Sequence, residues 1–510
     1  MNERTQRLIP PVVGGAALLV YCLTCCRTVY VGDSGELTLA LSTGGIAHPP
    51  GYPLYSILGY LWLKLFFFLT PVLAANLLSA AVTAAAVVIL YLILRRTAAG
   101  RVSPWINAAV ALSFAFSRSI WGSATNAEVY GLAALVYLMA LYIVIRYYEG
   151  DNPSGLIPAA FFCGLTLTHH FSAGVVGAAL LVVMYLRRKE LSSRLIIAAI
   201  GAFLLPMTLY LYLPARFDPM LPVNWMTAKS AAGLWGMITA DIYQQFVGLP
   251  TLGDIGLYLL RLGGLLAAAF GPGLLLLALP GAADVVRKKS SLALIVTLPA
   301  VFNIIMVSIY RIPDFEGYLI PLVVAAVFLL RESAALIPQR LYAHRWLPGA
   351  IAGFLIVFPV GFNFSTCDIS GFRLAERFGR DLLDSAPEKT LVFLKSDNGS
   401  HTALYLRYLE GYRPDLEVYS TNSTLARLEA RFAGDDYSWI VDSLDYMTNR
   451  VYRGAEYIIN QGVPPGYPDR ELVGFLYGLV AAETDQARLI NRRISEFIRD
   501  SLDRIDLNDD

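Results

Sequence analysis

The sequence predicts a polytopic α-helical membrane protein followed by a soluble α/β domain. Of its 510 residues, 56% are hydrophobic and only 15% are charged, far from the composition of a soluble protein. Apolar runs that approach the roughly 20 residues of a membrane span recur about eleven times before residue 364. After residue 365 the pattern changes to short strands and amphipathic helices. We therefore expect a membrane domain over residues 1–364 and a soluble α/β domain over 365–510.

The candidate spans cover most of the first domain. They are 8–27, 74–94, 104–121, 127–146, 155–171, 172–186, 194–214, 256–279, 292–310, 318–331 and 346–364. The first follows Arg4 and Arg7 and resembles a signal peptide, but no small-residue cleavage site follows it. We therefore interpret it as a retained span.

Basic residues follow alternate spans, and this bias predicts the orientation of the chain. The clusters are Arg95, Arg96 and Arg101; Arg187, Arg188, Lys189 and Arg194; Arg287, Lys288 and Lys289; and Arg331, Arg340 and Arg345. All lie on the cytoplasmic side if the N-terminus is cytoplasmic and segment 52–69 does not cross. We interpret 52–69 as an interfacial or re-entrant helix, with an ordinary transmembrane hairpin as the alternative. The loop 28–73 and the C-terminal domain then face the periplasm of a bacterium or the lumen of the endoplasmic reticulum.

Charge and cysteine content exclude several classes of protein. The formal net charge is +1, which gives no basis for nucleic-acid binding. The five cysteines follow no metal-ligand spacing, and four lie in apolar segments. We therefore expect no disulfide framework.

The most unusual segment is the loop after the first span, residues 33–55. Asp33 and Glu36 share one face if that turn is helical. His48 follows, beside residues that restrict or free the backbone: Pro49, Pro50 and Pro53, and Gly44, Gly45 and Gly51. A capping box of Asp33 and Glu36 is the alternative, but it explains neither the histidine nor the glycine pair. A rigid loop with carboxylates and an imidazole at the bilayer edge favours a functional site.

Other polar residues fall on the same predicted side of the membrane. They are Asn126 and Glu128; His169 and His170; Tyr212 and Arg216; Asn224, Trp225, Asp241, Tyr243 and Gln244; and Tyr310, Arg311, Asp314, Glu316 and Tyr318. Ionisable groups at membrane depth usually face a cavity and mark a substrate path. The alternatives are that Arg216 and Arg311 snorkel to headgroups, that Trp225 belongs to an aromatic belt, and that the histidines are buried imidazoles rather than zinc ligands.

The C-terminal domain begins as a strand–helix–strand unit. The pattern predicts strands over 390–395 and 416–419 with a helix over 398–409 between them. A third strand over 456–460 and a helix over 484–505 are also expected.

Two motifs resemble the GT-C superfamily of polyprenyl-phosphate-sugar-dependent glycosyltransferases. Asp33-Ser34-Gly35-Glu36 and Gly45-Ile46-Ala47-His48-Pro49-Pro50-Gly51-Tyr52-Pro53 are similar to the branch that contains the plexin-type protein O-mannosyltransferase and its bacterial relatives. Shorter similarities are 127–130, 213–216, 224–225 and 314–317, so the resemblance extends over about residues 10–330. It implies an enzyme that moves a sugar, with mannose as the candidate, from a polyprenyl-phosphate donor to a protein or glycan acceptor on the external side.

The residues suggest roles in such a transfer. A base must take the proton of the acceptor hydroxyl, and cations must stabilise the departing phosphate. We assign Asp33 as the base and Glu36 as the group that orients it, with inversion in one step. Candidates for the donor phosphate are Arg311, Arg216 and His48, and candidates for substrate binding are Glu128, Asn126, His169, Tyr52 and Trp225. The apolar walls between spans would hold the polyprenyl tail.

Three questions remain open at this level. A divalent metal could bind to Asp33, Glu36 and Glu128, whose oxygens are hard ligands, but the transfer could also proceed without one. A transporter or flippase for a lipid-linked substrate is the alternative function, although it would predict broken spans in two matching halves. A receptor or structural protein would explain the C-terminal domain but not the acidic loop.

Overall fold

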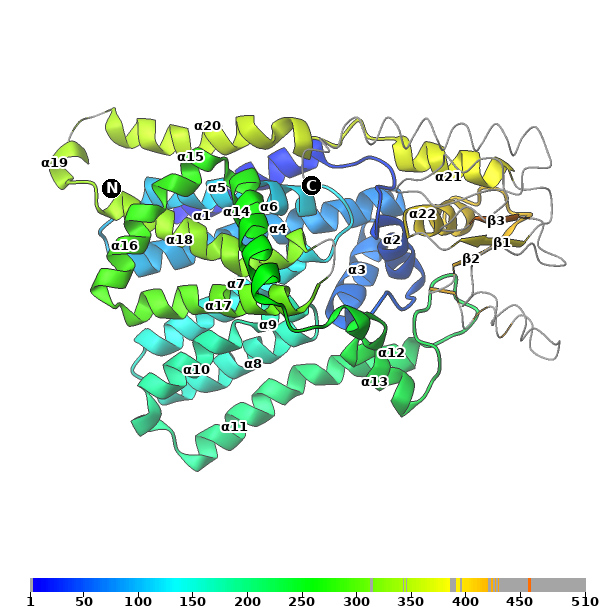
Figure 1. The fold of residues 1–510 in the computed structure, drawn as a ribbon, viewed down its shortest axis with the longest axis horizontal. Coiled ribbons are helices and arrows are strands. Elements are labelled where there is room, and N and C mark those ends of the chain that lie inside the picture. Colours follow the sequence, from blue (N-terminus) through cyan, green and yellow to red (C-terminus); the bar gives the residue numbers. More distant parts are fainter. Residues whose placement is uncertain are drawn as a thin grey trace.

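A computed structural model describes most of the chain (Figure 1). The described residues are 3–311, 315–342, 344, 346–385, 391–394, 397–420, 423–424, 427, 430 and 457–459. Asp314 and the helix expected over 484–505 lie outside these residues.

Eight long apolar helical segments of the described chain could span a membrane. Two of them combine consecutive elements: α11 (Ser193–Leu204) with η3 (Leu205–Leu211) and α12 (Tyr212–Arg216), and η5 (Glu316–Leu319) with α18 (Ile320–Ala335). A third is most of α14 (Leu252–Phe270). The others are α1 (Glu3–Thr24), α4 (Pro71–Ala98), α7 (Tyr130–Glu149), α17 (Ser291–Ile309) and α20 (Leu347–Cys367).

Shorter apolar helices occupy the three remaining candidate ranges. They are α5 (Pro104–Ala115), α8 (Leu156–Leu167), which continues the turn η1 (Pro153–Gly155), and α9 (Phe171–Gly174) with α10 (Gly177–Leu186). Each predicted range is therefore mostly helical, and the polytopic helical architecture is confirmed, although these three segments are too short to establish the number of spans.

The remaining short elements connect the long helices. They are α2 (Ser34–Thr43), α3 (Pro53–Leu65), α6 (Arg118–Ala124), η2 (Arg188–Glu190), α13 (Ala231–Thr239), η4 (Asp241–Phe246), α15 (Pro272–Leu277), α16 (Leu279–Lys288), α19 (Gln339–Tyr342) and α21 (Leu374–Ser385). Several helices start on a proline in the first turn, where the missing N–H costs nothing: Pro53, Pro71 and Pro104.

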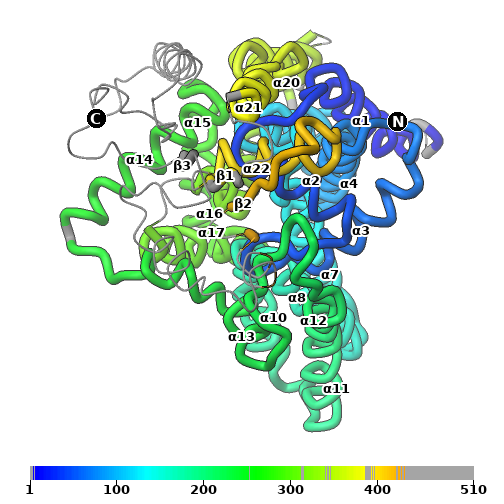
Figure 2. Tube along the Cα trace, turned by 90° about the vertical axis from the view of Figure 1, so that its right-hand side faces the viewer, coloured from blue at the N-terminus to red at the C-terminus, as the bar shows by residue number. Residues whose placement is uncertain are grey.

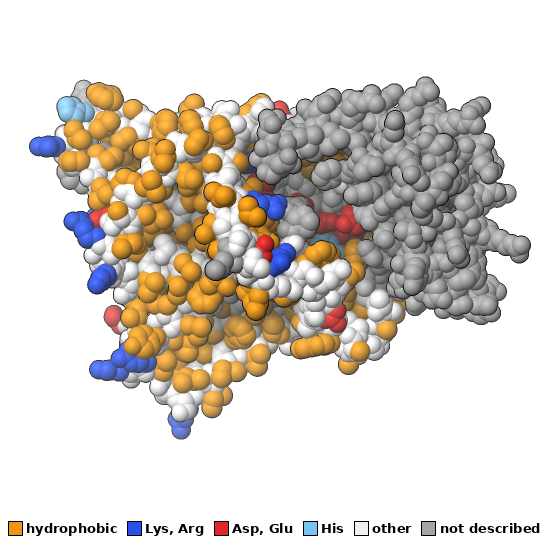
Figure 3. Space-filling view, in the orientation of Figure 1, with side chains coloured by type: hydrophobic (Ala, Val, Ile, Leu, Met, Phe, Trp, Pro, Cys, Tyr) orange, Lys and Arg blue, Asp and Glu red, His pale blue; other side chains and the backbone are white. Residues whose placement is uncertain are grey.

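The helices form a buried centre and an exposed apolar periphery. α4 packs against α1, α5 and α7, and α18 packs against α5, α16 and α17. In contrast, α11 has Ile197, Ile200 and Leu204 more than half exposed. Figure 3 shows hydrophobic side chains over the lateral surface of the bundle. Contiguous apolar surface of this kind is what contact with lipid tails requires.

Charged residues hold the helix ends together at one end of the bundle. Arg101 pairs with Glu332 at 3.1 Å, Arg96 pairs with Glu149, and buried Arg331 lies 2.8 Å from Glu332. In Figure 3 most of the visible lysines and arginines lie along the left edge, away from α2. The basic loops that predicted the orientation thus gather at one end, and the acidic loop lies at the other (Figure 1).

Segment 52–69 forms α3, which is too short to cross a bilayer. Its 13 residues extend only about 20 Å, against a hydrocarbon thickness of about 30 Å. Leu58, Leu61 and Leu65 on its outer face are exposed, as is Phe67 directly after it. The length and the exposed apolar face of this helix are compatible with the interfacial or re-entrant helix that the sequence predicts, and its place at a membrane stays a prediction.

The C-terminal part contains a parallel sheet beside the acidic loop. β1 (Leu391–Leu394) pairs with β2 (Glu417–Ser420) and with β3 (Tyr457–Ile459), in the order β2-β1-β3, and α22 (Asp397–Tyr408) connects β1 to β2. These elements match the predicted strand–helix–strand unit and third strand. Figure 2 views the end of the molecule where α22 and the strands lie beside α2.

The orientation can be tested with a cysteine at Thr70, an exposed position between α3 and α4. Thr70→Cys in a Cys22→Ser background should react with an impermeant maleimide applied to intact cells, because positive-inside charge bias puts this loop outside. The other four native cysteines are buried.

Lys189→Cys, at an exposed site in the basic η2 turn, is the matched control and should react only after the membrane is opened. Protection of Thr70→Cys together with labelling of Lys189→Cys would show that the orientation is reversed.

Candidate active site

The acidic motif begins α2, but it does not cap the helix. Asp33 occupies the N-cap position with helical backbone angles, and its side chain accepts no capping hydrogen bond. Glu36 is completely buried and accepts hydrogen bonds from His48 rather than from the N-cap backbone. The capping-box alternative is therefore wrong, because both carboxylates interact with other parts of the chain.

Glu36 and His48 form a buried ion pair. One carboxylate oxygen of Glu36 accepts from the His48 backbone N–H at 2.7 Å, and the other accepts from the ring Nδ1–H at 2.8 Å. Although burial alone would lower the pKa of His48, the charges of Glu36 and Asp33 raise it to about 10. Burial raises the pKa of Glu36, but the positive His48 outweighs it and lowers that pKa below its ordinary value. Both groups are thus held in their charged forms at neutral pH.

Asp33 is the carboxylate of the motif that remains open to water. Its side chain is 37% exposed, whereas that of Glu36 is 0% exposed. The Nε2 atom of His48 lies 3.8 Å from Asp33, too far for a hydrogen bond but close enough for its charge to act. Burial by the surrounding helices raises the pKa of Asp33, and the charge of His48 opposes this rise. Asp33 is therefore more basic than an ordinary aspartate while staying accessible.

The loop between α2 and α3 is fixed by contacts from distant segments. Arg216 donates to the carbonyl oxygens of Gly44 at 3.0 Å and Thr43 at 3.1 Å. Gly44 has φ +66°, a left-handed conformation that suits glycine. The Trp225 backbone N–H donates to Ile46, and the Trp225 ring lies 6.0 Å from that of His48. Two of the predicted residues, Arg216 and Trp225, thus meet the motif through this loop.

Tyr52 connects His48 to the two other predicted histidines. Its hydroxyl lies 2.9 Å from Nε2 of His48, and its ring stacks on that of His170. His169 lies behind, with Nε2 2.8 Å from the carbonyl oxygen of Val129. The structure therefore places His169 in a buried layer of the site wall, where its ring is 5.9 Å from that of Tyr52.

A polar cavity of about 290 Å³ lies beside this layer. It includes two predicted residues, Glu128 and Asn126, and the charge of Glu128 also acts on His48. Arg118, which the sequence reasoning missed, lies in the wall 3.8 Å from Glu316. The remaining lining residues are Tyr30, Ser119, Gly122, Ser123, Thr125, Tyr130, Gly317, Thr366, Cys367 and Ile369.

Arg311, a predicted phosphate contact, bonds to Leu249 and Asp254. Its guanidinium donates to the carbonyl oxygen of Leu249 at 2.5 Å and to Asp254 at 3.3 Å. It is not among the residues that line the cavity. A role for Arg311 at a phosphate would require the bond to Asp254 to be exchanged for one to the donor.

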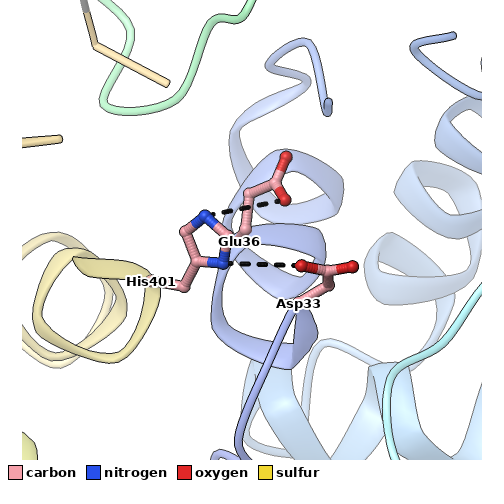
Figure 4. A group of neighbouring side chains, drawn as sticks. All are labelled: Asp33, Glu36 and His401. Atoms are coloured by element: carbon pink, nitrogen blue, oxygen red, sulfur yellow. Dashed lines mark ion pairs between the residues drawn. The ribbon is translucent and has the colours of Figure 1, made fainter. Parts of the chain in front are cut away.

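His401, in the C-terminal helix α22, also reaches the acidic motif (Figure 4). Its ring nitrogens lie 3.7 Å from Asp33 and 3.9 Å from Glu36. Ligand atoms of these three residues all lie within 4.8 Å of one another, so they could hold a divalent cation. Sequence reasoning missed His401, although histidine is rare in the chain; four of its five histidines gather here.

The buried pair predicts a pH-dependent contribution to stability. Glu36→Gln should lower the free energy of unfolding by about 1.5–3 kcal/mol near pH 6, since it removes charge-assisted hydrogen bonds. Because folding lowers the pKa of Glu36, this carboxylate stabilises the fold at pH values above its pKa in the unfolded chain. Because folding raises the pKa of His48, the stabilisation by His48 is lost as the pH rises toward about 10. The destabilisation measured by thermal unfolding in detergent should therefore be smaller at pH 9 than at pH 6.

Glu149→Gln is the matched control, because Glu149 pairs with Arg96 on the surface at the opposite end. Its effect should be about 0–1 kcal/mol. If Glu36→Gln lowered the free energy of unfolding by the same amount at pH 6 and at pH 9, His48 would not be charged.

Known proteins resemble the chain in sequence. Residues 33–193 match the family model "Protein O-mannosyl-transferase TMEM260 N-terminal domain". The Protein O-mannosyl-transferase TMEM260 of Mus musculus is 26% identical over 448 residues, covering 78% of this chain and 60% of the relative. The corresponding protein of Dictyostelium discoideum is 24% identical over 463 residues, covering 79% of this chain and 56% of the relative. The chain thus spans little more than half the length of these relatives.

Solved structures show a similar fold. ArnT from Cupriavidus metallidurans in the apo state gives a TM-score of 0.57 at 14% identity, covering 86% of this chain and 91% of the other. The same protein bound to undecaprenyl phosphate gives a TM-score of 0.53 at 14% identity, covering 80% of this chain and 85% of the other. The resemblance to the protein O-mannosyltransferase branch is therefore confirmed in sequence, and the chain has a fold similar to that of ArnT.

Proposed function

We propose that the chain is a membrane glycosyltransferase that moves a sugar from a polyprenyl-phosphate donor to a hydroxyl of a protein or glycan acceptor. Asp33 acts as the general base, on the periplasmic or lumenal side of the membrane. The names of the two curated relatives favour mannose as the sugar. The bound undecaprenyl phosphate of the ArnT structure favours a lipid-phosphate donor.

The observation that carries this proposal is the contrast between the two carboxylates of the motif. Glu36 is buried and neutralised by His48, whereas Asp33 is accessible and has a raised pKa. Carboxylates whose surroundings separate their pKa values usually have separate chemical roles. Asp33 has the exposure and basicity to take a proton from an acceptor hydroxyl, and Glu36 holds the surrounding loop.

The adjoining cavity supports a place for the head of the donor. Carboxylates and amides such as Glu128 and Asn126 bond to sugar hydroxyls, and Arg118 provides a cation for phosphate. The wall also contains the end of α20, a candidate span whose Phe362 and Phe364 are exposed. A lipid phosphate at the membrane edge would reach the cavity there, with its tail along the apolar helices. Arg216, Arg311 and His48 remain proposed phosphate contacts.

The proposed reaction needs one displacement. The hydroxyl of the acceptor attacks the anomeric carbon while Asp33 takes its proton, and the bond from that carbon to the phosphate oxygen breaks. The polyprenyl phosphate leaves with the electron pair, stabilised by the cations near it. The configuration inverts, and Asp33 later releases the proton to water.

Asp33→Asn tests the base directly. We expect transfer to fall by about 10²-fold or more, because the amide cannot accept the proton, while donor binding and folding stay close to those of the wild type. Transfer would be measured as the sugar mass added to a co-purified acceptor when purified enzyme meets polyprenyl-phosphate mannose. Glu36→Gln should cost less at temperatures where it remains folded.

Asp218→Asn is the control, since this exposed loop carboxylate accepts, among the described residues, from the backbone N–H of Met220 and from no other donor. Near-normal transfer by Asp33→Asn would remove the base from the mechanism, and no transfer by the wild type with any polyprenyl-phosphate sugar would contradict the proposed function.

The proposed phosphate contacts predict weaker use of the donor. Arg118→Gln, Arg216→Ala and Arg311→Ala should each raise the donor KM about ten- to a hundredfold, because each removes a charge-assisted contact of about 1.5–3 kcal/mol. Arg27→Gln is the control, because within the described part of the chain this exposed arginine donates only to carbonyl oxygens of α1. If one of these three variants has a donor KM like that of Arg27→Gln, the arginine that it replaces does not contact the donor phosphate.

A further inference from the structure

The C-terminal helix α22 packs directly on the acidic motif. Figures 1 and 4 show α22 beside α2, although more than 350 residues separate them in sequence. At the closest point a Cβ on Gly35 would lie 2.4 Å from the carbonyl oxygen of His401 and 2.7 Å from its carbonyl carbon. No larger residue fits there without moving the helix. The glycine of the motif is thus explained by the contact with α22.

α22 also bonds to the backbone next to Asp33. The side-chain oxygen of Asn398 accepts from the N–H of Gly32 at 2.8 Å, and Nδ1 of His401 lies 3.2 Å from the carbonyl oxygen of Gly32. A carbonyl oxygen can only accept, so the hydrogen-bond network assigns the proton to Nδ1. These two bonds hold Gly32 in place, and Gly32 directly precedes Asp33 in the chain.

The ring of His401 lies between the two carboxylates of the motif. His401 is 1% exposed, with Nδ1 3.7 Å from Asp33 and Nε2 3.9 Å from Glu36. Among the described residues, Nε2 has no hydrogen-bond partner. A buried polar atom without a partner is costly. Its place facing Glu36 therefore points to a functional constraint rather than to packing.

We propose that His401 is a positioning residue for the transfer reaction, through which the C-terminal region completes the active site. This rests on the proposed function of Asp33 as base. His401 and Asn398 hold Gly32, and the imidazole limits the directions that the Asp33 carboxylate can take. Because His401 does not line the cavity proposed for the donor, its loss affects the rate of transfer rather than the binding of donor.

The test compares His401→Ala with a neighbour on the same helix. Thr402 is also 1% exposed, but it packs toward Gly379 of α21, and its hydroxyl has no partner among the described residues. We expect His401→Ala to lower kcat about 10- to 100-fold, the cost of a misplaced catalytic group, with the donor KM within about twofold of the wild-type value. Thr402→Val should leave both unchanged.

A conservative variant distinguishes positioning from folding. In His401→Asn the side-chain N–H can occupy roughly the place of Nδ1–H, so this variant should recover part of the lost kcat. Gly35→Ala provides a second route if His401→Ala does not fold, because the added Cβ would displace α22 from the motif. It should lower kcat while the binding of polyprenyl phosphate to the purified protein persists.

Each result decides the proposal. Unchanged kcat in His401→Ala, or equal losses in His401→Ala and Thr402→Val, would overturn the positioning role. Stoichiometric divalent metal in the purified wild type that is absent from His401→Ala would also overturn it, because His401 would then be a ligand. Failure of the wild type to transfer sugar contradicts the proposed function itself, whereas normal transfer by His401→Ala contradicts only this inference.

Discussion

A fully buried carboxylate, that of Glu36, is the constraint on which the rest of this site depends. An ionised carboxylate removed from water must be paired and hydrogen-bonded. His48 does both, through its backbone N–H and its ring. It can do so only because the chain turns back after α2 and returns to the same place twelve residues later. The glycines and prolines of that turn, and the contacts of Arg216 and Trp225 with it, serve the same pairing.

The pairing separates the two carboxylates of one helical turn into different environments. Glu36 is charged, inaccessible and held in place, so it cannot exchange protons with a substrate. Asp33 remains at the surface of the site, where His48 lies near enough to influence its charge without a hydrogen bond. A short acidic motif thus contains both a buried ion pair and an accessible carboxylate, the one that we propose as the base, and the difference between them is burial.

The membrane helices hold this site at one end of the bundle and provide its walls. α6, α7 and the end of α20 contribute to the cavity, and the connection after α8 contributes the histidines that pack on Tyr52. The ends of the helices opposite the site are fixed by ion pairs such as that of Arg101 with Glu332. A rigid bundle with a polar cavity at one end suits a reaction between a lipid-borne donor and an acceptor that arrives from water.

The sequence by itself determined the features that depend on local pattern. Long apolar runs specify helices wherever they fall, and the strands over 391–394 and 417–420 with the helix between them followed from alternation and period. Asp33, Glu36 and His48 were identified because such residues are rare and costly at a membrane edge. Only the tertiary structure decided which of the carboxylates is buried, because exposure depends on the return of the loop and on helices far along the chain. The same is true of Arg118 and His401, which no local pattern distinguishes from a surface arginine and a helix histidine. Their proximity to the site arises from packing between segments that the sequence separates by tens or hundreds of residues.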